Sequence, residues 1–378
     1  MHDEKVFGEH SYEVLTSSRE GLQRQSEHFG TEQRHDTDGY NIIPLGYCTY
    51  RNRSDDGFFT FNVNNAFTTG IVSKFYPVFK FVGANSTFMT EYLNHSISNK
   101  KKLSILAVGT SQVVLSISAL RSASFCIPHE KEQDKLASFI ELLNIRIVKQ
   151  RQLVELLKKY KRGVSKRFFD EIHNDQNCEA KQFSEVFELI QNNTFSRECL
   201  TDENTDVLNV HYGDILVKYG SVLDPDIDTV PFIKSGTDLS KFSGSSYLQD
   251  GDVIFADTAE DYTVGKMCEI INVSNRKILS GLHTMPFRPT SAFTPMYLGY
   301  YLNSAAFRTQ ILPMIQGAKV SSISKSEMKK TIMYIPSINR QKEIVNILNA
   351  LDKRIIRTEL ILTELKEMKK GLLQNLFI

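Results

Sequence analysis

The strongest constraint on this chain is that one unit is written twice within its 378 residues. A shift of 208 positions superposes residues 109–169 on 317–377 without a gap, and 14 of the 61 paired positions are identical. The landmarks keep their order: Gly109 meets Gly317, Ser116 meets Ser324, Ile127-Pro128 meets Ile335-Pro336, Gln133 meets Gln341, and upstream Tyr92-Leu93-Asn94 matches Tyr301-Leu302-Asn303. Ordered landmarks over this distance indicate an internal duplication, and therefore two copies of one fold.

In each copy, the residues after Ile-Pro predict one long helix, because proline suits the first turn of a helix but not its interior. Apolar residues then recur at alternating steps of four and three over nearly five heptads, which is typical of a coiled-coil seam. The apolar seam consists of Leu136, Ile140, Leu143, Ile147, Val154 and Leu157 in the first copy, and of Ile344, Leu348, Leu351, Ile355, Leu362 and Leu365 in the second. The non-apolar positions, Gln150 and Lys161, fall where Thr358 and Lys369 stand in the other copy.

A helix of about 40 residues is about 60 Å long at 1.5 Å per residue. Two such helices in one chain pair most simply with each other in antiparallel fashion, with a globular unit at each end and an approximate two-fold axis. An amphipathic helix lying on a globular core is the alternative, but such a helix usually has a wider apolar stripe and is shorter.

The first half of each copy predicts a mixture of short strands and helices. We expect strands at 215–217, after Tyr212-Gly213-Asp214, and at 253–255, after Gly251-Asp252, and helices over 295–303 and 88–94. The predicted fold is therefore α+β, with two α/β domains joined by two long helices in an antiparallel coiled coil with a pseudo-two-fold repeat. The expected boundaries are 1–128 for the first domain, 129–172 for the central helix, 173–336 for the second domain and 337–378 for the C-terminal helix.

The charge of the chain excludes a surface that is basic throughout, because the net charge is only +1. Residues 129–172 carry 11 basic and 7 acidic side chains, whereas residues 1–128 carry 12 of each, so any nucleic-acid surface must be local. Five scattered cysteines without a C-x-x-C spacing favour reduced thiols over disulfides or a zinc site. No apolar run is long enough for a membrane span and no signal segment follows Met1, so we expect a cytoplasmic protein.

The motifs of common enzymes are absent from the sequence. There is no G-x-G-x-x-G, no Walker loop and no [N/D]-P-P-[Y/F] tetrapeptide that would place a base beside a methyl donor. His129-Glu130 lacks the second histidine of a zinc protease, because position 133 is Gln. Asp226 and Glu327-x-Lys329 lie about a hundred residues apart, which is a poor match to a nuclease site. We therefore expect no catalytic residue and no metal site, and favour a binding protein.

The duplicated plan resembles the specificity subunits of type I restriction–modification systems over essentially the whole chain. Each copy ends in a glycine loop, a Leu/Ile-Ser pair, Ile-Pro, a glutamine early in the helix, and a Leu-Lys, Lys, Gly and Phe series near the helix end. These stand as Gly109, Leu115-Ser116, Ile127-Pro128, Gln133, Leu157-Lys158, Lys161, Gly163 and Phe169, and as Gly317, Ile323-Ser324, Ile335-Pro336, Gln341, Leu365-Lys366, Lys369, Gly371 and Phe377.

The resemblance implies two target-recognition domains, each reading one half of a split site in double-stranded DNA, with the helices setting the spacing. It also implies that modification (methyltransferase) subunits, two in number, dock on the helices and bring S-adenosylmethionine. A restriction subunit would bring ATP and magnesium, so that this chain binds no cofactor itself. In one respect the sequence departs from the plan: residues 173–208 have no counterpart in the first copy, whose recognition domain is expected to be shortened.

Candidate DNA contacts follow from residue type alone, since Arg, Lys, Asn and Gln supply most phosphate and base-edge contacts. In the first domain they are Arg51, Asn52 and Arg53 in a polar loop after a strand, Lys74 beside Tyr76, and the triplet Lys100, Lys101 and Lys102. In the second domain they are Lys218, Tyr219, Arg288 and Lys319. The alternative function is a coiled-coil adaptor whose globular ends bind proteins, which would show no salt-sensitive DNA affinity.

Overall fold

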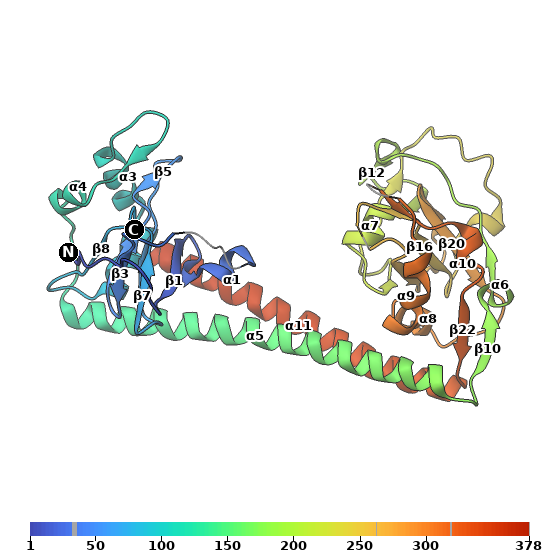
Figure 1. Cartoon of the computed structure of the whole chain (residues 1–378). Coiled ribbons are helices and arrows are strands. Elements are labelled where there is room, and N and C mark those ends of the chain that lie inside the picture. Colours follow the sequence, from blue (N-terminus) through green and yellow to red (C-terminus); the bar gives the residue numbers. More distant parts are fainter. Residues whose placement is uncertain (32–35, 262, 318–319, 378) are drawn as a thin grey trace. The chain divides into compact units, whose positions relative to one another are not determined.

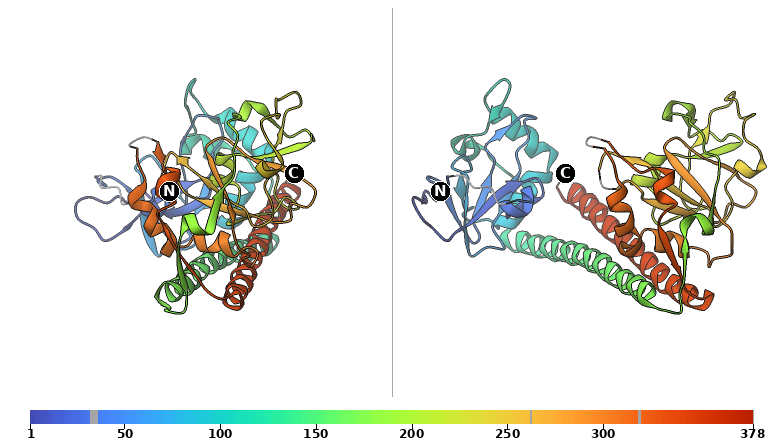
Figure 2. Two further views of the ribbon diagram at one scale, coloured as in Figure 1. Left: turned by 90° about the vertical axis from the view of Figure 1, so that its right-hand side faces the viewer. Right: turned by 45° about the vertical axis from the view of Figure 1, so that its right-hand side comes forward.

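The computed structural model describes residues 1–31, 36–261, 263–317 and 320–377, which form two compact units. Unit 1 comprises Met1–Gln152 and Glu359–Ile378, and unit 2 comprises Leu153–Thr358. The two long helices are α5, Glu130–Asn174, and α11, Ile338–Leu376, and each contributes to both units. They are the long green and red coils of Figures 1 and 2. The predicted fold class, α+β with two domains joined by long helices, is confirmed.

Unit 1 contains two main sheets. The first has the order β2-β1-β7-β3, with β1 Glu13–Ser18, β2 Gly21–Arg24, β3 Asn41–Pro44 and β7 Thr69–Val72. The second has the order β6-β4-β8, with β4 Cys48–Tyr50, β6 Phe61–Val63 and β8 Val78–Phe79. A third, two-stranded ladder pairs β5 Arg53–Ser54 with β9 Val113–Val114. The shorter helices are α1 Gln25–Phe29, α2 Ser86–His95, α3 Ile97–Leu106 and α4 Ile117–Ser122.

Unit 2 has a five-stranded and a four-stranded sheet. The larger has the order β11-β20-β16-β18-β14, with β11 Phe187–Leu189, β14 Val222–Leu223, β16 Val253–Ala256, β18 Met267–Ile270 and β20 Thr284–Pro289. The smaller has the order β12-β15-β13-β19, with β12 Leu200–Thr201, β13 Val207–Val210, β15 Phe232–Ile233 and β19 Lys277–Ser280. Two short ladders pair β10 Glu179–Gln182 with β22 Ile332–Ile335, and β17 Thr258–Ala259 with β21 Ser321–Ser322. The shorter helices are α6 Phe183–Val186, α7 Tyr212–Val217, α8 Tyr297–Leu302, α9 Ala305–Ile311 and α10 Lys325–Met328, with 3-10 turns η1 Arg197–Cys199, η2 Gly244–Ser246 and η3 Leu312–Met314.

The predicted strand at 215–217 is wrong, because Tyr212–Val217 forms helix α7. The His211 ring accepts a hydrogen bond from the Gly213 amide and caps the helix, and Ile215 is buried in the core below it. A three-residue apolar run fits a buried helix turn as well as a strand, so its periodicity cannot separate the two. The strand predicted at 253–255 lies within β16, and the helices predicted at 88–94 and 295–303 correspond to α2 and α8.

The duplication extends to individual hydrogen bonds. The Gln133 side chain accepts from the Asn85 amide at 3.0 Å and donates to the Pro128 carbonyl at 2.8 Å. Gln341 repeats both bonds, accepting from the Thr294 amide at 2.9 Å and donating to the Pro336 carbonyl at 3.0 Å. Each glutamine thereby ties the start of a long helix to the loop that leads into α2 or α8.

A second asparagine-centred contact is also repeated, and it joins helix to sheet. The Asn94 side chain, in α2, bonds the amide and carbonyl of Phe61 in β6 at 2.8 and 2.7 Å. Asn303, directly after α8, bonds the amide and carbonyl of Met267 in β18 at 3.2 and 2.9 Å. These pairs fix the correspondence of β6 with β18 and, through shared ladders, of β4 with β16 and β8 with β20.

The long helices lie antiparallel within each unit. In unit 1, Ala137 and Ile140 of α5 share a buried cluster with Leu373 and Phe377, while Leu143 and Ile147 share another with Leu365. In unit 2, Phe168 and Ile172 lie in one cluster with Ile344 and Leu348. The twelve residues of the predicted seam are all buried or half-buried: Leu136, Ile140, Leu143, Ile147, Val154, Leu157, Ile344, Leu348, Leu351, Ile355, Leu362 and Leu365.

The two lysines in the seam each anchor a globular domain to the helices. In unit 2, Lys161 pairs with Asp352 at 2.5 Å, and the Tyr300 hydroxyl donates to the other oxygen of that carboxylate at 2.8 Å. In unit 1, Lys369 pairs with Glu91 of α2 at 3.5 Å. The lysine exceptions in the heptad pattern therefore connect the long helices to α2 directly and to α8 through Asp352.

Candidate nucleic-acid interface

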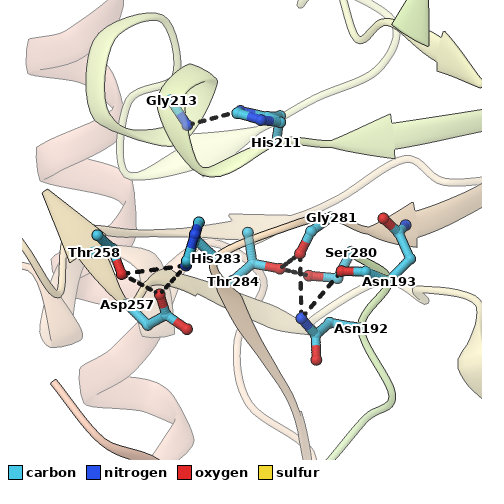
Figure 3. Close-up of polar contacts among 10 residues, drawn as sticks. All are labelled: Asn192, Asn193, His211, Gly213, Asp257, Thr258, Ser280, Gly281, His283 and Thr284. Carbon is cyan, nitrogen blue, oxygen red and sulfur yellow. Dashed lines mark hydrogen bonds and ion pairs between the residues drawn. The ribbon is translucent and has the colours of Figure 1, made fainter. Parts of the chain in front are cut away.

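Two loops of unit 2 meet beyond the ends of strands β16 and β19 (Figure 3). The first carries Asp257 and Thr258, and the second runs from Gly281 to His283 before β20 begins. The Thr258 hydroxyl lies 3.4 Å and the Asp257 carboxylate 3.5 Å from Nδ1 of His283, whose side chain is 47% exposed. An exposed imidazole, a hydroxyl and a carboxylate can form hydrogen bonds with base edges.

The backbone of the second loop is unusual for its residue types. His283 has φ of 54°, in the left-handed region that non-glycine residues rarely adopt. Gly281 is required by space, since a Cβ there would lie 2.6 Å from Nδ2 of Asn209 and 2.8 Å from the Val210 carbonyl oxygen. The Thr284 and Ser280 hydroxyls lie 2.6 Å apart inside the turn, and Thr284 also donates to the Gly281 carbonyl. The fold thus holds a costly conformation that presents His283 outward.

Basic side chains lie beside this loop. Arg197 donates two hydrogen bonds to the buried Asp214 carboxylate, at 2.8 and 2.9 Å, and Lys218 pairs with it at 3.1 Å. Burial pushes the pKa of Asp214 upward, but the bonds from Arg197 and Lys218 outweigh burial and hold it below its ordinary value. One carboxylate between two half-exposed cations leaves a local positive charge, which suits phosphate contact.

His211 lies under the same face, and its ring packs against that of Tyr212, which in turn contacts His283. Burial lowers the pKa of His211, the charges of Arg197 and His283 lower it further, and Asp214 partly offsets them. The lowered pKa favours the neutral ring, whose Nδ1 accepts from the Gly213 amide.

Unit 1 places basic and aromatic side chains in the equivalent loops. The Arg53 guanidinium lies 5.1 Å and the Lys74 ammonium 5.7 Å from the ring centroid of Phe75, which is 49% exposed. Arg51 and Arg53 also line a shallow cleft of about 220 Å³. The structure thus brings together Arg51, Arg53 and Lys74, three predicted DNA contacts that span 23 positions of the sequence. Cations around an exposed ring are typical of nucleic-acid surfaces.

The ladders establish that these loops correspond between the units. Arg53 opens β5, which pairs with β9, and Thr258 opens β17, which pairs with β21. The Leu115 amide donates to the Asn52 carbonyl, just as the Ile323 amide donates to the Asp257 carbonyl. Phe75 and His283 follow the equivalent strands β7 and β19 by three residues. In unit 1, Arg53 therefore lies close to the ring of Phe75. In unit 2, Thr258 at the equivalent place lies close to the ring of His283.

The lysine triplet of unit 1 lies on helix α3, apart from this loop pair in sequence. Lys101 and Lys102 are exposed and Lys100 is half-buried. The Lys102 ammonium donates to the Ser124 carbonyl at 2.6 Å and lies 5.4 Å from the centroid of Phe125. It thus holds the segment that leads into α5. Asn52 is half-buried, its carbonyl is used in the ladder, and its Oδ1 has no hydrogen-bond partner among the described residues.

Two of the predicted contacts in unit 2 have structural roles instead. Tyr219 is buried in the core, where its hydroxyl donates to the Thr229 carbonyl. Arg288 donates twice to the buried Asp252 carboxylate, at 2.9 and 2.7 Å, and once to the Tyr247 carbonyl. Both therefore leave the set of DNA-contact candidates, because sequence shows residue type but not burial. Lys218 remains exposed, and Lys319 lies outside the described residues.

Sequence reasoning missed Thr258, His283, Arg197 and Phe75. The duplication held a signal for Thr258, since Arg53 was a candidate and Thr258 is its counterpart in the second copy. It held none for His283, whose counterpart Phe75 was not a candidate. Arg197 gave no signal, because it lies in the segment 173–208 that has no counterpart.

A second apolar stripe follows the outer side of α5. In the part that belongs to unit 1, Leu142 is 67% exposed and Ile145 is also exposed, and in the part within unit 2, Leu156 and Tyr160 are exposed. The residues of α11 at 208 positions further on from Leu142, Ile145 and Leu156 are Ala350, Lys353 and Glu364. Helix α11 also has exposed apolar side chains, at Ile347, Ile356, Leu360 and Met368, but not at these three places. The stripe on α5 is a candidate surface for another protein.

Across the described ranges, no group of three or more His, Cys, Asp or Glu side chains could hold a metal ion. No helix in the part of the chain that the structure describes is both long and apolar enough to cross a membrane.

The family comparisons agree with this architecture. The family model for the type I restriction modification DNA specificity domain matches residues 176–367, just over half of the chain. A curated protein of Methanocaldococcus jannaschii, described as a type I restriction enzyme MjaX specificity subunit, is 26% identical over 234 residues. The match covers 60% of this chain and 51% of that protein, so the chain spans about half the length of this curated relative.

Among solved structures, the S subunit of a type I restriction-modification system from M. genitalium superposes with a TM-score of 0.55 at 14% identity. The superposition covers 99% of this chain and 90% of that one. The HsdS subunit from Thermoanaerobacter tengcongensis gives a TM-score of 0.46 at 15% identity, covering 91% and 83%. The first of these likenesses shows a shared fold.

Proposed function

The chain belongs to the family of type I restriction modification DNA specificity domains, and from this premise we propose that it is the specificity subunit that reads a two-part DNA target. Unit 1 reads one half of the target and unit 2 reads the other. The equivalent loop pairs, residues 51–53 with 73–76 and residues 256–258 with 281–284, are the reading surfaces.

One observation carries this proposal: the two units repeat the backbone of the equivalent loops but carry different side chains on it. Arg53 with Phe75 occupies the place that Thr258 with His283 occupies in the other copy. A structural contact would favour the same residues in both copies, as at Gln133 and Gln341. Different side chains on an equivalent frame are what an asymmetric target with two unlike halves requires.

The side chains divide by what they can contact. Lys74, Arg51, Lys218 and Arg197 are long and half-exposed or exposed cations suited to phosphates, which set register without reading sequence. Arg53, Thr258 and His283 sit on short ordered segments and are suited to base edges.

Partner subunits supply the chemistry in this proposal. Modification subunits, two per chain, dock on the long helices and bring S-adenosylmethionine, and a restriction subunit brings ATP and magnesium. The exposed stripe of Leu142, Ile145, Leu156 and Tyr160 on α5 supports docking on the helices. This chain then acts without catalysis of its own, and the complex works in the cytoplasm where its DNA is.

The test is a map of methylated sites in a methylation-free host that carries this chain with the modification subunit of its own system. The wild type should methylate a split motif. His283→Ala or Thr258→Ala should relax only one half, and Arg53→Ala only the other, with about 1–3 kcal/mol of lost discrimination at the affected base. Arg121→Ala, which changes an exposed arginine on α4, is the matched control and should leave the motif unchanged.

Two results would count against the proposal. If Arg53→Ala and His283→Ala altered the same half, the assignment of one half to each unit would be wrong. If the methylated sites did not depend on this chain at all, the adaptor function would be favoured, and the chain should then show no salt-sensitive affinity for duplex DNA.

A further inference from the structure

The two equivalent reading loops rest on unrelated asparagine side chains. We propose that Asn41 in unit 1 and Asn192 in unit 2 are positioning residues that determine specificity without touching DNA, each for one half of the target. The inference rests on the proposed function, because it assigns to these asparagines the precision of loops proposed to read bases.

In unit 1 the support comes from β3. Asn41 is buried, and its Nδ2 donates to the Tyr76 carbonyl at 2.9 Å, with the Ser73 and Lys74 carbonyls at 3.5 Å. These three carbonyls belong to the turn that carries Lys74 and Phe75. The Asn41 side-chain amide therefore holds three backbone carbonyls of the 73–76 loop, whose side chains at Lys74 and Phe75 are exposed.

In unit 2 the support comes from the segment between β11 and η1. The Asn192 Nδ2 donates to the Gly281 and Asn193 carbonyls, both at 3.3 Å, as Figure 3 shows beside the loop. The Asn193 amide donates to the Ser280 carbonyl at 2.8 Å, and its side chain donates to Asn209 at 2.6 Å. Leu248 donates to Ile278 of β19 and so takes the place of Ile43, which is opposite Gly70 of β7. The place of Asn41, two residues earlier, is then held by Ser246, so the two supports have separate origins.

Support of this kind matters because the loop of unit 2 is strained. His283 holds φ of 54°, and Gly281 packs directly on Asn209. Non-glycine residues keep such a conformation only where surrounding bonds enforce it. Without the Asn192 amide, the Gly281 carbonyl loses a donor on the side that faces away from His283, and the turn can relax. A base contact needs its side chain placed to within a fraction of an ångström, whereas a phosphate contact by a long lysine does not.

The consequence separates specificity from affinity. Loss of Asn192 or Asn41 should lower discrimination against a mismatch in one half-site by roughly tenfold, which is the low end of what one base contact is worth. Affinity for non-specific duplex, and its dependence on salt, should stay unchanged because every basic side chain remains.

The experiment uses the full chain in complex with its modification subunit. The variants are Asn192→Ala and Asn41→Ala, with Asn177→Ala and Asn65→Ala as matched controls, since both are exposed asparagines of the same units. Binding is measured to the mapped target duplex, to duplexes with one mismatch in either half, and to a duplex without the target. Melting of each complex is measured in parallel.

Support requires that Asn192→Ala lowers discrimination only in the half affected by His283→Ala, and Asn41→Ala only in the half affected by Arg53→Ala, with non-specific affinity and both controls unchanged. Asn192 is only half-buried, so its variant gives the result even when Asn41→Ala lowers the melting temperature. Unchanged discrimination in Asn192→Ala, with His283→Ala still active on its half, would overturn this inference and leave the proposed function standing. If neither His283→Ala nor Arg53→Ala altered a half-site, the proposed function itself would fail.

Discussion

At the scale of single residues, two glutamines that would be expected on the surface from their polarity are buried instead. Gln133 and Gln341 are almost fully buried and bond the same two backbone groups in their respective units. A buried amide that lost its partners would cost about 1–3 kcal/mol, which gives a physical reason for glutamine at this point of both copies. Neither residue contacts DNA in the proposal; both fix the start of a long helix.

One buried acid makes the stability of unit 2 depend on pH. Glu269 is 1% exposed, and its carboxylate accepts from the amides of Met296 at 2.6 Å and Gly299 at 2.8 Å. Burial raises its pKa from 4.5 to about 7, and the backbone bonds only partly oppose this. As pH rises, the unfolded chain loses this proton near pH 4.5 but the folded chain keeps it until about pH 7, so stability falls across that window and not above it.

At 1.36 kcal/mol per pH unit, the wild type should lose about 3 kcal/mol of unfolding free energy between pH 4.5 and pH 7 through Glu269. We expect Glu269→Gln to lack this loss, because glutamine does not ionise. The measurement is chemical denaturation of both proteins at pH 5 and pH 8. The change in unfolding free energy between the two pH values is then compared between the wild type and the variant. Glu260→Gln, an exposed acid, is the control and should leave the pH profile of the wild type intact. Parallel profiles for Glu269→Gln and the wild type would show that the carboxyl is ionised throughout.

At the scale of secondary-structure elements, helix α5 has one apolar side that packs within the chain and another that is exposed. One side of α5 packs on α11 through the seam, and the outer side carries Leu142 and Ile145 exposed. The outer side of α11 has Ala350 and Lys353 at these places. Because the seam is satisfied within the chain, the outer stripe does not contribute to folding, and the proposed partner is what would bury it.

Leu142→Glu should therefore change the stability of the chain by less than about 0.5 kcal/mol but prevent co-purification with the modification subunit. The control is Lys353→Glu at the equivalent place on α11, which should co-purify normally. Pull-down and size-exclusion chromatography measure the complex, and a melting curve measures the fold. Normal assembly of Leu142→Glu would show that the partner binds elsewhere.

At the scale of the whole molecule, both long helices pass from one compact unit into the other. Each unit has its own core, so the helices are the continuous elements that join them. In the proposal, their length sets the number of unread base pairs between the two half-sites.

Insertion of four residues, about one turn, into both α5 and α11 should lengthen the spacer and leave both half-sites unchanged. The rise of about 6 Å corresponds to roughly two base pairs. The insertions belong at the boundary between the units, after Gln152 and after Thr358. Methylation mapping reads out the spacer directly. New half-site sequences with an unchanged spacer would contradict the role of the helices.

The sequence by itself determined the duplication, the long helices and the family. These depend on periodicity and on ordered landmarks such as Ile-Pro followed by glutamine, and such patterns survive because each landmark makes a local bond that folding in either unit requires. The sequence also named Arg51, Arg53 and Lys74 as candidates, and all three are exposed in the structure.

Only the tertiary structure decided which polar residues face outward. Tyr219 and Arg288 have the right chemistry for DNA, yet one is in the core and the other is bound to Asp252, since burial depends on segments far away in the chain. The meeting of Thr258 with His283, and of Arg53 with Phe75, likewise arises from the pairing of β16 with β20 and of β4 with β8, whose paired residues are 28 or more positions apart. Local sequence carries no record of such pairings, and so the equivalent loop pairs could be recognised only in the folded chain.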